Sequence, residues 1–295
     1  MAETEHAVER AEDGVDGDLP AWVPGAFDLA GELAANPRLR QEDLDELATW
    51  ARKQHALPAM QEGDFVKFLH SCEYDVLAAQ QCINYYYRTR STTPSVFCDR
   101  DVRLPSVRAQ LNVLDFVVVP RLAPDGCRII INGLTDPDPR NYVFEDHQKL
   151  LLMMMDAMVA AEPTLPGVYI IYDLDMGLIS HFWKFGFWLQ RKLFAYFQGG
   201  LPLLLKSCIL LHTPSYINTV MKVLRNFTDR KRLDETKMFE GDDFAELHKL
   251  LPRECLPSDY GGTLPSRKEL HEMTWRRLDS LRDSFAEEEE ALKKK

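Results

Sequence analysis

Four short, nearly uninterrupted apolar runs restrict the fold of this chain more than any other feature. Two of them, DFVVV and CRIII, are joined by a turn at Pro124-Asp125-Gly126, and the others are GVYIIYD (residues 167–173) and SCILLH (residues 207–212). Strands covered on both faces have this composition, and parallel neighbours need a long crossover between them. Long helix-patterned segments separate the later runs, so the sequence predicts an α/β fold with a mainly parallel sheet.

Helical periodicity fills most of the chain between and around these runs. Apolar positions recur every three or four residues in segments 141–161, 179–198 and 215–227. The run TKMFEGDD at residues 236–243 predicts one more short strand. We expect four parts in all, which are a disordered acidic leader (1–25), an N-terminal helical domain (26–95), the α/β domain (96–265) and a charged, solvated C-terminal helix (266–295).

Charge and cysteine content narrow the class of protein. A formal net charge of −11 argues against nucleic-acid binding, which needs a concentrated basic face. The six cysteines are scattered without a CxxC pair, so we expect reduced, mostly buried thiols and no metal site. The acidic N-terminus has no signal-peptide pattern, and the apolar runs are too short to cross a bilayer. We therefore expect a monomeric cytoplasmic protein that associates peripherally with membranes.

No catalytic or cofactor motif is complete. GGLPLLLKS has the Lys-Ser of a phosphate loop, but Leu205 stands where that loop needs its second glycine. Asp173 and Asp175 follow a strand, where α/β enzymes keep their chemistry. No further acid, histidine or lysine clusters beside them, so capping of the next helix is favoured. His181 and His212 are isolated in apolar surroundings and are interpreted as core or pocket histidines. The sequence predicts neither an enzyme nor a resident cofactor.

The stretch from residue 150 to residue 221 is unusually poor in charge, with only eight charged residues. Helices that cover a sheet normally have one apolar stripe and one polar face, but here apolar groups recur on almost all faces. One interpretation is a thick core. The other is two apolar layers that face each other across a cavity holding a hydrophobic ligand. Composition leaves both open.

Five motifs, taken in order, carry a resemblance to a known family. KFLHSCEYDVLAAQQCINYYYRTR is similar to its N-terminal signature, DGCRIII to its Asp-x-x-Gly-Arg strand entry, GVYIIYDLDMG to its Asp-terminated strand, LPLLLKSCILLHTP to its Pro-Leu-Lys strand and LPSDYGG to its closing motif. Residues 36–275 thus resemble the CRAL-TRIO (Sec14-like) lipid-binding family, in the branch with the retinaldehyde-binding and α-tocopherol-transfer proteins. LPSDYGG is interpreted as a structural closure, in which Gly261 and Gly262 turn with positive φ.

The resemblance implies a three-helix N-terminal domain and an α/β/α sandwich. Its apolar cavity would lie between the sheet and overlying helices and would be closed by a mobile gate helix at residues 215–227. The strand residues would form its floor, those of segment 179–198 its lid and those of segment 215–227 its gate. The implied lining residues are Leu150, Met154, Met158, Ile170, Tyr172, Ile179, Trp183, Phe187, Leu193, Tyr196, Phe197, Leu205, Cys208, Leu210, Ile217, Val220, Met221 and Leu224.

Two departures from the family pattern bear on the ligand. Leu150 and Met154 stand where tocopherol-binding relatives have small hydroxyl residues, and the resulting Met-rich wall suits a larger or less polar ligand. Relatives that bind phosphoinositides carry several basic residues around the gate. This chain keeps only Lys206, Arg225 and Lys231 there, which predicts a weak attraction to membranes and no strong phosphoinositide coordination.

The leading hypothesis is a carrier without catalytic activity. It would bind one small hydrophobic molecule, such as a retinoid, tocopherol, carotenoid or related lipid, and transfer it between membranes through the gate helix. Two alternatives remain, which are a phospholipid or phosphoinositide exchange protein and a lipid-regulated protein-interaction module with a filled core. The expected partners are a hydrophobic ligand and, transiently, a membrane surface.

Overall fold

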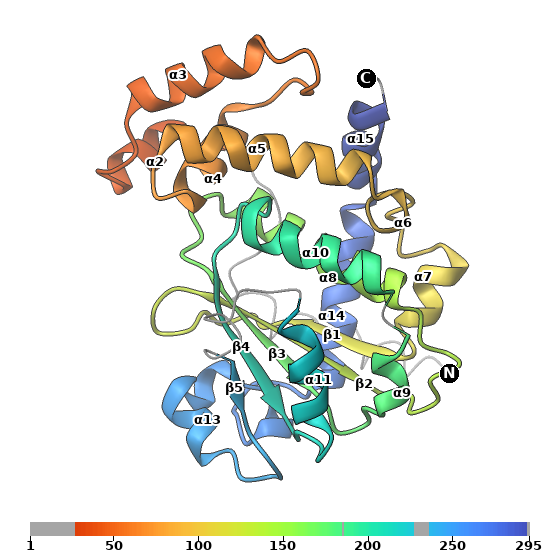
Figure 1. Ribbon diagram of the computed structural model, residues 1–295. Helices are drawn as coiled ribbons and strands as arrows, with labels where there is room; N and C mark the ends of the chain where they lie inside the picture. The colour runs from red at the N-terminus through yellow and green to blue at the C-terminus, as the bar shows by residue number, and fades with distance from the viewer. Residues whose placement is uncertain (1–26, 185, 227–235, 294–295) are drawn as a thin grey trace, which may run out of the picture.

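A five-stranded sheet is the frame of the protein (Figure 1). The computed structural model describes residues 27–184, 186–226 and 236–293, and its strands follow the order β1-β2-β3-β4-β5. β1 runs antiparallel to β2, whereas the other neighbours are parallel. The fold class predicted from the apolar runs is therefore confirmed. The strands are β1 Leu114–Val118, β2 Arg128–Leu134, β3 Val168–Asp173, β4 Leu205–Leu211 and β5 Lys237–Met238.

Helices cover both faces of the sheet and extend beyond it at the N-terminal end (Figure 1). Asp28 and Asp75 cap two of the N-terminal helices, because their carboxylates accept hydrogen bonds from the backbone amides of Gly31 and Ala78. The helices are α2 Leu29–Ala35, α3 Gln41–Arg52, α4 Glu62–Ser71, α5 Val76–Ser91, α6 Pro94–Phe97, α7 Pro105–Gln110, α8 Phe144–Ala161, α9 Ile179–Phe182, α10 Phe187–Gly199, α11 Ile217–Leu224, α13 Ala245–Leu250, η1 Arg253–Cys255, η2 Ser258–Tyr260, α14 Arg267–Ser280 and α15 Arg282–Lys293.

The two faces of the sheet belong to different cores, since successive side chains of a strand point to opposite sides. Ile129 and Ile171 lie in the core that the sheet forms with α13 and α14. Ile130 and Ile170 point the other way, into the core shared with α8, α10 and the N-terminal helices. The sheet is therefore a wall between a closely packed face and the face on which a cavity is found.

The aromatic segment 179–198 differs from the single helical stretch that its sequence predicts. It forms the short helix α9 and the longer helix α10, with Gly186 as the N-cap of α10 in an extended conformation. Glycine has the highest conformational freedom of any residue and lowers the stability of a helix interior. The break changes the direction of the chain and separates the side chains of α9 from those of α10.

The C-terminal segment is also different from the solvated charged helix expected for it. It forms two helices, and α14 lies along β1, where the buried His271 accepts from the amide of Phe116 at 2.9 Å. In α15 the side chain of Phe285 is buried. One acid of the Glu-rich run, Glu288, accepts hydrogen bonds from Arg90 and Arg100. The acidic run is therefore part of the tertiary structure.

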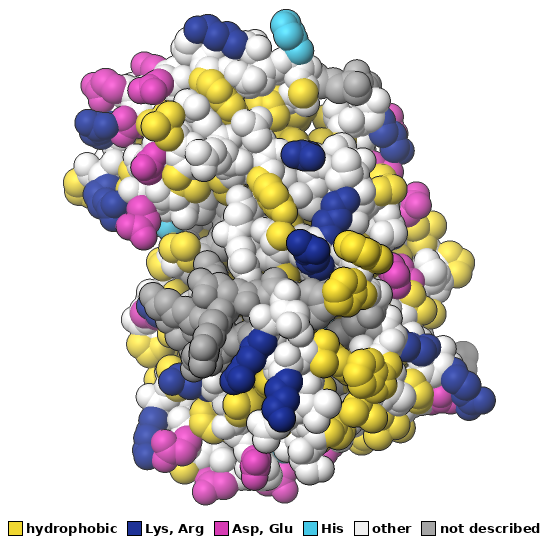
Figure 2. Space-filling view, in the orientation of Figure 1, with side chains coloured by type: hydrophobic (Ala, Val, Ile, Leu, Met, Phe, Trp, Pro, Cys, Tyr) yellow, Lys and Arg dark blue, Asp and Glu magenta, His cyan; other side chains and the backbone are white. Residues whose placement is uncertain are grey.

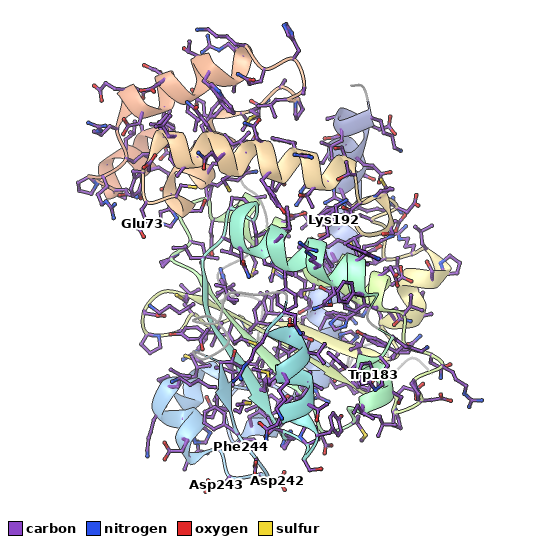
Figure 3. All side chains as sticks on the ribbon, viewed as in Figure 1. Glu73, Trp183, Lys192, Asp242, Asp243 and Phe244 are labelled. Carbon is purple, nitrogen blue, oxygen red and sulfur yellow. The ribbon has the colours of Figure 1, made fainter. Side chains whose placement is uncertain are left out.

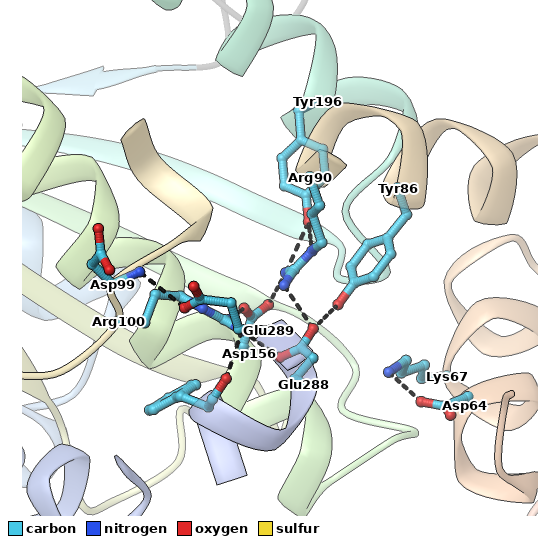
Figure 4. Close-up of polar contacts among 11 residues, drawn as sticks. Asp64, Lys67, Tyr86, Arg90, Asp99, Arg100, Asp156, Tyr196, Glu288 and Glu289 are labelled. Atoms are coloured by element: carbon cyan, nitrogen blue, oxygen red, sulfur yellow. Dashed lines mark hydrogen bonds and ion pairs between the residues drawn. The ribbon is translucent and has the colours of Figure 1, made fainter. Parts of the chain in front are cut away.

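Arg90 is the centre of a buried ion cluster that joins four helices (Figure 4). Its guanidinium, 0% exposed, donates to Asp156 of α8 and, at 2.8 Å, to Glu288 of α15. It also donates to the Tyr196 hydroxyl of α10 at 3.2 Å. Arg100 completes the cluster by binding the second oxygens of both carboxylates at 3.0 and 2.8 Å. Each buried charge thus has a partner of opposite sign, which burial of a charge requires.

Asp173 organises the other end of the molecule, where β3 ends. Its carboxylate accepts from the amide of Asp175 at 3.1 Å, within the turn after β3. The predicted capping of the next helix is wrong, because the N-cap of α9 is Leu178. The Asp173 carboxylate also contacts His212 at 2.7 Å, the Tyr260 hydroxyl at 2.9 Å and the guanidinium of Arg267. His212 is therefore paired with a carboxylate and is not isolated. These contacts tie η2 and α14 to the ends of β3 and β4.

The LPSDYGG motif closes the sandwich through this contact of Tyr260 with Asp173. Gly261 has the predicted positive φ of +68°, but Gly262 is not among the residues with positive φ. Gly262 is needed for a different reason, because a Cβ there would lie 1.8 Å from the carbonyl oxygen of Leu256. In this motif the backbone at Gly262 passes close to the backbone at Leu256, and the tight turn places Tyr260 under the sheet.

The Arg90 cluster leads to a prediction about stability. Exchange of Arg90 for Met leaves Asp156 and Glu288 as poorly compensated acids, so we expect the free energy of unfolding to fall by about 3–5 kcal/mol. Urea unfolding followed by far-UV circular dichroism measures this change. The control is Arg140→Met, because Arg140 is 87% exposed and pairs with Asp138, two residues earlier in the chain. Equal effects of the two exchanges would contradict the importance of the cluster.

The same cluster predicts how stability depends on pH. Burial alone would raise the pKa of the Glu288 carboxyl, but the charges of Arg90 and Arg100 outweigh burial and hold this pKa well below its ordinary value. The resulting stabilisation is complete above the pKa of the unfolded chain and is lost as the pH falls towards the lowered pKa. Between about pH 5 and pH 3 we expect wild-type stability to fall more steeply than that of Glu288→Gln. The urea midpoint of both proteins is measured as a function of pH. If it falls with the same slope in the wild type and in Glu288→Gln, the prediction is refuted.

Candidate functional site

A cavity of about 300 Å³ lies between the sheet and the helices α8 to α11. Its volume is at the lower end of the range of small-molecule sites. The floor consists of side chains that alternate along β3 and β4, which are Val168, Ile170 and Tyr172 on β3 and Cys208 and Leu210 on β4. These strands are paired with Ile170 opposite Cys208 and Tyr172 opposite Leu210, so the floor is continuous.

Helix α10 forms the roof of the cavity through one face. Leu193 and Phe197 line the cavity from this face, at the four-residue spacing of one helical surface. Leu205, the first residue of β4, also lines the cavity and is paired with Val168 of β3. The opposite face of α10 contacts α5, where the Arg90 guanidinium donates to the Tyr196 hydroxyl (Figure 4). On the same face the ammonium of Lys192, labelled in Figure 3, donates to the carbonyl of Thr92 at 2.6 Å.

Helix α11 forms a side wall at the position predicted for the gate. The side chains at its three- and four-residue spacing all line the cavity, which are Ile217, Val220, Met221 and Leu224. They form a small apolar cluster with Leu210, separate from the main core. Phe227, the expected last residue of the gate helix, lies outside the described residues. The floor, two of the six expected lid residues and the gate are thus brought together as the sequence predicts, although their contact with a ligand stays a prediction.

Three of the residues expected on the α8 wall lie elsewhere. Leu150, Met154 and Met158 are 0% exposed and pack in the main core. Met155, Gln148 and Phe144 line the cavity in their place. A shift of one residue turns a side chain by about 100° around a helix, so the prediction had the right helix and the wrong face. The wall is correspondingly less rich in methionine than expected.

Four of the expected lid residues are also away from the cavity wall. Trp183 and Phe187 are 62% and 55% exposed, because the break between α9 and α10 turns them outwards. Trp183 is labelled in Figure 3. Ile179 starts α9 and does not line the cavity. Tyr196 points away from it, to Arg90. Phe182 and Phe194, which are not among the implied lining residues, line the cavity instead.

One set of polar side chains on the cavity wall is hydrogen-bonded within the protein. The His147 ring lies 2.8 Å from the Tyr142 hydroxyl through Nδ1 and 3.3 Å from the Asn132 carboxamide oxygen through Nε2. Burial lowers the pKa of His147 to about 4, so this histidine is neutral at physiological pH. The sequence analysis did not predict these contacts among Tyr142, His147 and Asn132. The feature that could have indicated them is Asn132, a polar residue at a cavity-facing position of an otherwise apolar strand.

Two other polar side chains on the wall have atoms without partners. Nε2 of His181 and Oε1 of Gln190 are buried, and neither atom has a hydrogen-bond partner. His181 is 5% exposed, which fits the prediction of a pocket histidine. Its Nδ1 accepts from the amide of Leu178 at 3.1 Å. Gln190, in the first turn of α10, was not singled out by its sequence context.

Two of the three basic residues expected near the gate, Lys206 and Arg225, are not among the residues that line the cavity. Lys206 has a side chain 52% exposed and pairs with Asp125 at 3.2 Å, and Arg225 is exposed at the C-cap of α11. Lys231 lies outside the described residues. No lysine or arginine is among the described residues that line the cavity. Its one carboxylate, Asp173, is paired with Arg267.

No other hollow or cluster of side chains in the described chain is a second candidate for an apolar ligand site. A hollow of about 700 Å³ lies among α2, α3 and α4, but Asp45, Arg52 and Glu62 are part of its wall. In the described ranges, no three His, Cys, Asp or Glu side chains are grouped to hold a metal ion. The described helices are each too short or too polar to cross a membrane.

Comparison with known proteins agrees with this architecture. Residues 115–262 match the CRAL/TRIO domain, and residues 36–107 match the Pinta-like UBA domain. Alpha-tocopherol transfer protein-like from Homo sapiens is 25% identical over 261 residues, which are 87% of this chain and 75% of that protein. Clavesin-2 from Rattus norvegicus is 22% identical over 237 residues, 79% of this chain and 72% of that protein. The crystal structure of Sfh5 covers 83% of this chain and 92% of its own, with 12% identity and a TM-score of 0.48.

The CRAL/TRIO match begins in β1, ends at the second glycine of LPSDYGG and includes every strand residue of the cavity floor. It spans half of the 295 residues. The protein therefore belongs to the CRAL/TRIO domain family.

Proposed function

We propose that this protein is a carrier without catalytic activity that binds one small hydrophobic molecule and transfers it between membranes. The candidates are a retinoid, a tocopherol, a carotenoid or a related lipid. The observation that carries the proposal is the cavity over β3 and β4, whose described wall is mostly apolar and without lysine or arginine. The names of the relatives that are alpha-tocopherol transfer protein-like agree with it.

Burial of the ligand would supply the affinity. Each 100 Å² of apolar ligand surface removed from water contributes about 2.5 kcal/mol. No acid, base or nucleophile is needed for this step. A two-chain phospholipid is a poorer match, because a cavity of about 300 Å³ is small for it and its phosphate would meet no positively charged side chain on the described wall.

Helix α11 is suited to open the cavity. Its buried residues contribute to a small cluster of their own at the cavity, so its displacement would leave the cores on either side of the sheet intact. The helix has only eight residues, and short helices gain most of their stability from packing. Lys222 and Arg225 are exposed on its outer surface, where they would be attracted to an anionic membrane.

An exposed aromatic surface beside α11 would hold the carrier at the membrane. We call Trp183, Phe187 and Trp188 the aromatic rim; these side chains are 62%, 55% and 75% exposed. Figure 2 shows apolar side chains gathered over α9 and the start of α10, with basic side chains nearby. Tryptophan and neighbouring basic residues favour the membrane–water interface. Trp183 and Phe187, which were expected in the inner lid, are therefore assigned to the outer surface.

The first test of this function is loading with lipid. Purified protein would be exposed to a cell lipid extract, repurified and analysed by mass spectrometry of its organic extract. We expect one predominant apolar species in the wild type. In Cys208→Trp the indole occupies the cavity floor, so we expect bound lipid to fall by about tenfold or more. Cys98→Trp introduces the same side chain away from the cavity and serves as the control. Wild-type protein that stays empty would exclude the carrier function.

The second test concerns the membrane. Replacement of the aromatic rim by serine should weaken binding to vesicles of phosphatidylcholine and phosphatidylserine. We expect about tenfold for each side chain, because burial of an aromatic group contributes ~1.5–3 kcal/mol. Sedimentation with the vesicles measures it. The control is Leu77→Ser, since Leu77 is equally apolar and 67% exposed but lies on α5. The same loss in both variants would argue against the rim as the docking surface.

A further inference from the structure

Two sets of polar atoms on the cavity wall differ in their hydrogen bonding within the protein. Those of Tyr142, His147 and Asn132 bind one another and need nothing from a ligand. Nε2 of His181 and Oε1 of Gln190 are buried without a partner. Nearly all buried polar groups in proteins are hydrogen-bonded, and an unpaired one costs about 1–3 kcal/mol. The cavity is the space that both side chains border, so a partner is to be expected there.

The hydrogen-bonding role of His181 follows from its other nitrogen. The amide of Leu178 donates to Nδ1, so Nδ1 carries no proton. Burial lowers the pKa of His181, and the ring is therefore neutral at physiological pH. A neutral imidazole has one N–H, which must then be on Nε2. His181 thus offers a donor, whereas the carboxamide oxygen of Gln190 offers an acceptor.

We propose that the ligand is a lipid alcohol, whose single hydroxyl accepts a hydrogen bond from Nε2–H of His181 and donates one to Oε1 of Gln190. This inference rests on the proposed carrier function and narrows its ligand class. A hydroxyl is the smallest organic group that both donates and accepts.

Other functional groups satisfy this pair of side chains less well. An aldehyde, ketone or ether can only accept, so the Gln190 oxygen would stay unpaired. A fatty-acid carboxylate would place a negative charge beside that oxygen, and the described cavity wall has no lysine or arginine to compensate it. A hydrocarbon such as a carotene leaves both atoms unpaired. Recognition by buried polar groups discriminates strongly against analogues that lack the hydroxyl.

The experiment compares each alcohol with its own methyl ether. The probes are 1-hexadecanol, all-trans-retinol and cholesterol, which differ in shape, with hexadecanoic acid as the charged analogue. Affinities are measured by displacement of a fluorescent lipid from the full-length protein. We expect at least one alcohol to bind about tenfold or more tightly than its ether. Equal affinities of every bound alcohol and its ether would overturn the proposal. A water molecule bridging the two side chains would give that result.

Two variants assign the effect to the named atoms. Gln190→Met keeps the length of the side chain and removes the acceptor, so the preference for alcohol over ether should fall about tenfold. His181→Phe should have the same effect on the ratio. Gln81→Met, an exposed glutamine of α5, is the matched control. Equal weakening of alcohol and ether by Gln190→Met would show a purely structural role and would also overturn the proposal.

The outcomes separate this inference from the function on which it rests. If the wild type binds ethers, hydrocarbons and alcohols alike, the carrier function stands and alcohol recognition is refuted. If the wild type takes up neither the probes nor any species from a lipid extract, both fail. Uptake from the extract of a species without a hydroxyl would refute only the alcohol class.

Discussion

The contact between the Arg90 guanidinium and the Tyr196 hydroxyl is the interaction on which the cavity depends. An apolar cavity tends to collapse, because its lining atoms lack neighbours on one side. Here the roof helix α10 is held from its outer face, by Arg90 with Tyr196 and by Lys192 with the carbonyl of Thr92. Arg90 is itself fixed by acids of α8 and α15. The N-terminal helices and the C-terminal helix thus keep the roof away from the floor.

The contacts of Asp173 hold the floor strands in place from below the sheet, as the Arg90 cluster holds the roof. Gly133 leaves room for Arg267, since a Cβ at this position would lie 2.8 Å from the Cβ of Asp173 and 3.1 Å from the guanidinium. Arg267 thereby reaches Asp173 and also Asp115 of β1. The floor is fixed by charge pairs and the roof by another cluster of charge pairs. Helix α11, whose buried side chains form a small cluster of their own, is left as the wall that is least attached.

The sequence was sufficient for the fold and for the strand side of the cavity. Alternation along a strand leaves two choices of face, and Ile170 and Cys208 were placed correctly because β3 and β4 pair without a shift from Tyr169 and Ser207 onwards. A helix offers more choices of phase, so Met154 was expected where Met155 lies. Trp183 and Phe187 were misplaced because the helix break at Gly186 was not foreseen. The role of Glu288 depends on contacts with residues almost 200 positions earlier in the chain, which no local pattern encodes.

The same reasoning explains why polar residues, and not the apolar ones, carry the information about the ligand. Apolar walls accept many shapes, since their attraction is non-directional. A buried donor or acceptor has a direction and a cost if unpaired. His147 has both its ring nitrogens paired within the protein, so it constrains the fold alone. His181 has one ring nitrogen paired and one unpaired. The unpaired nitrogen, together with the Gln190 oxygen, is where the structure specifies more about its ligand than hydrophobicity.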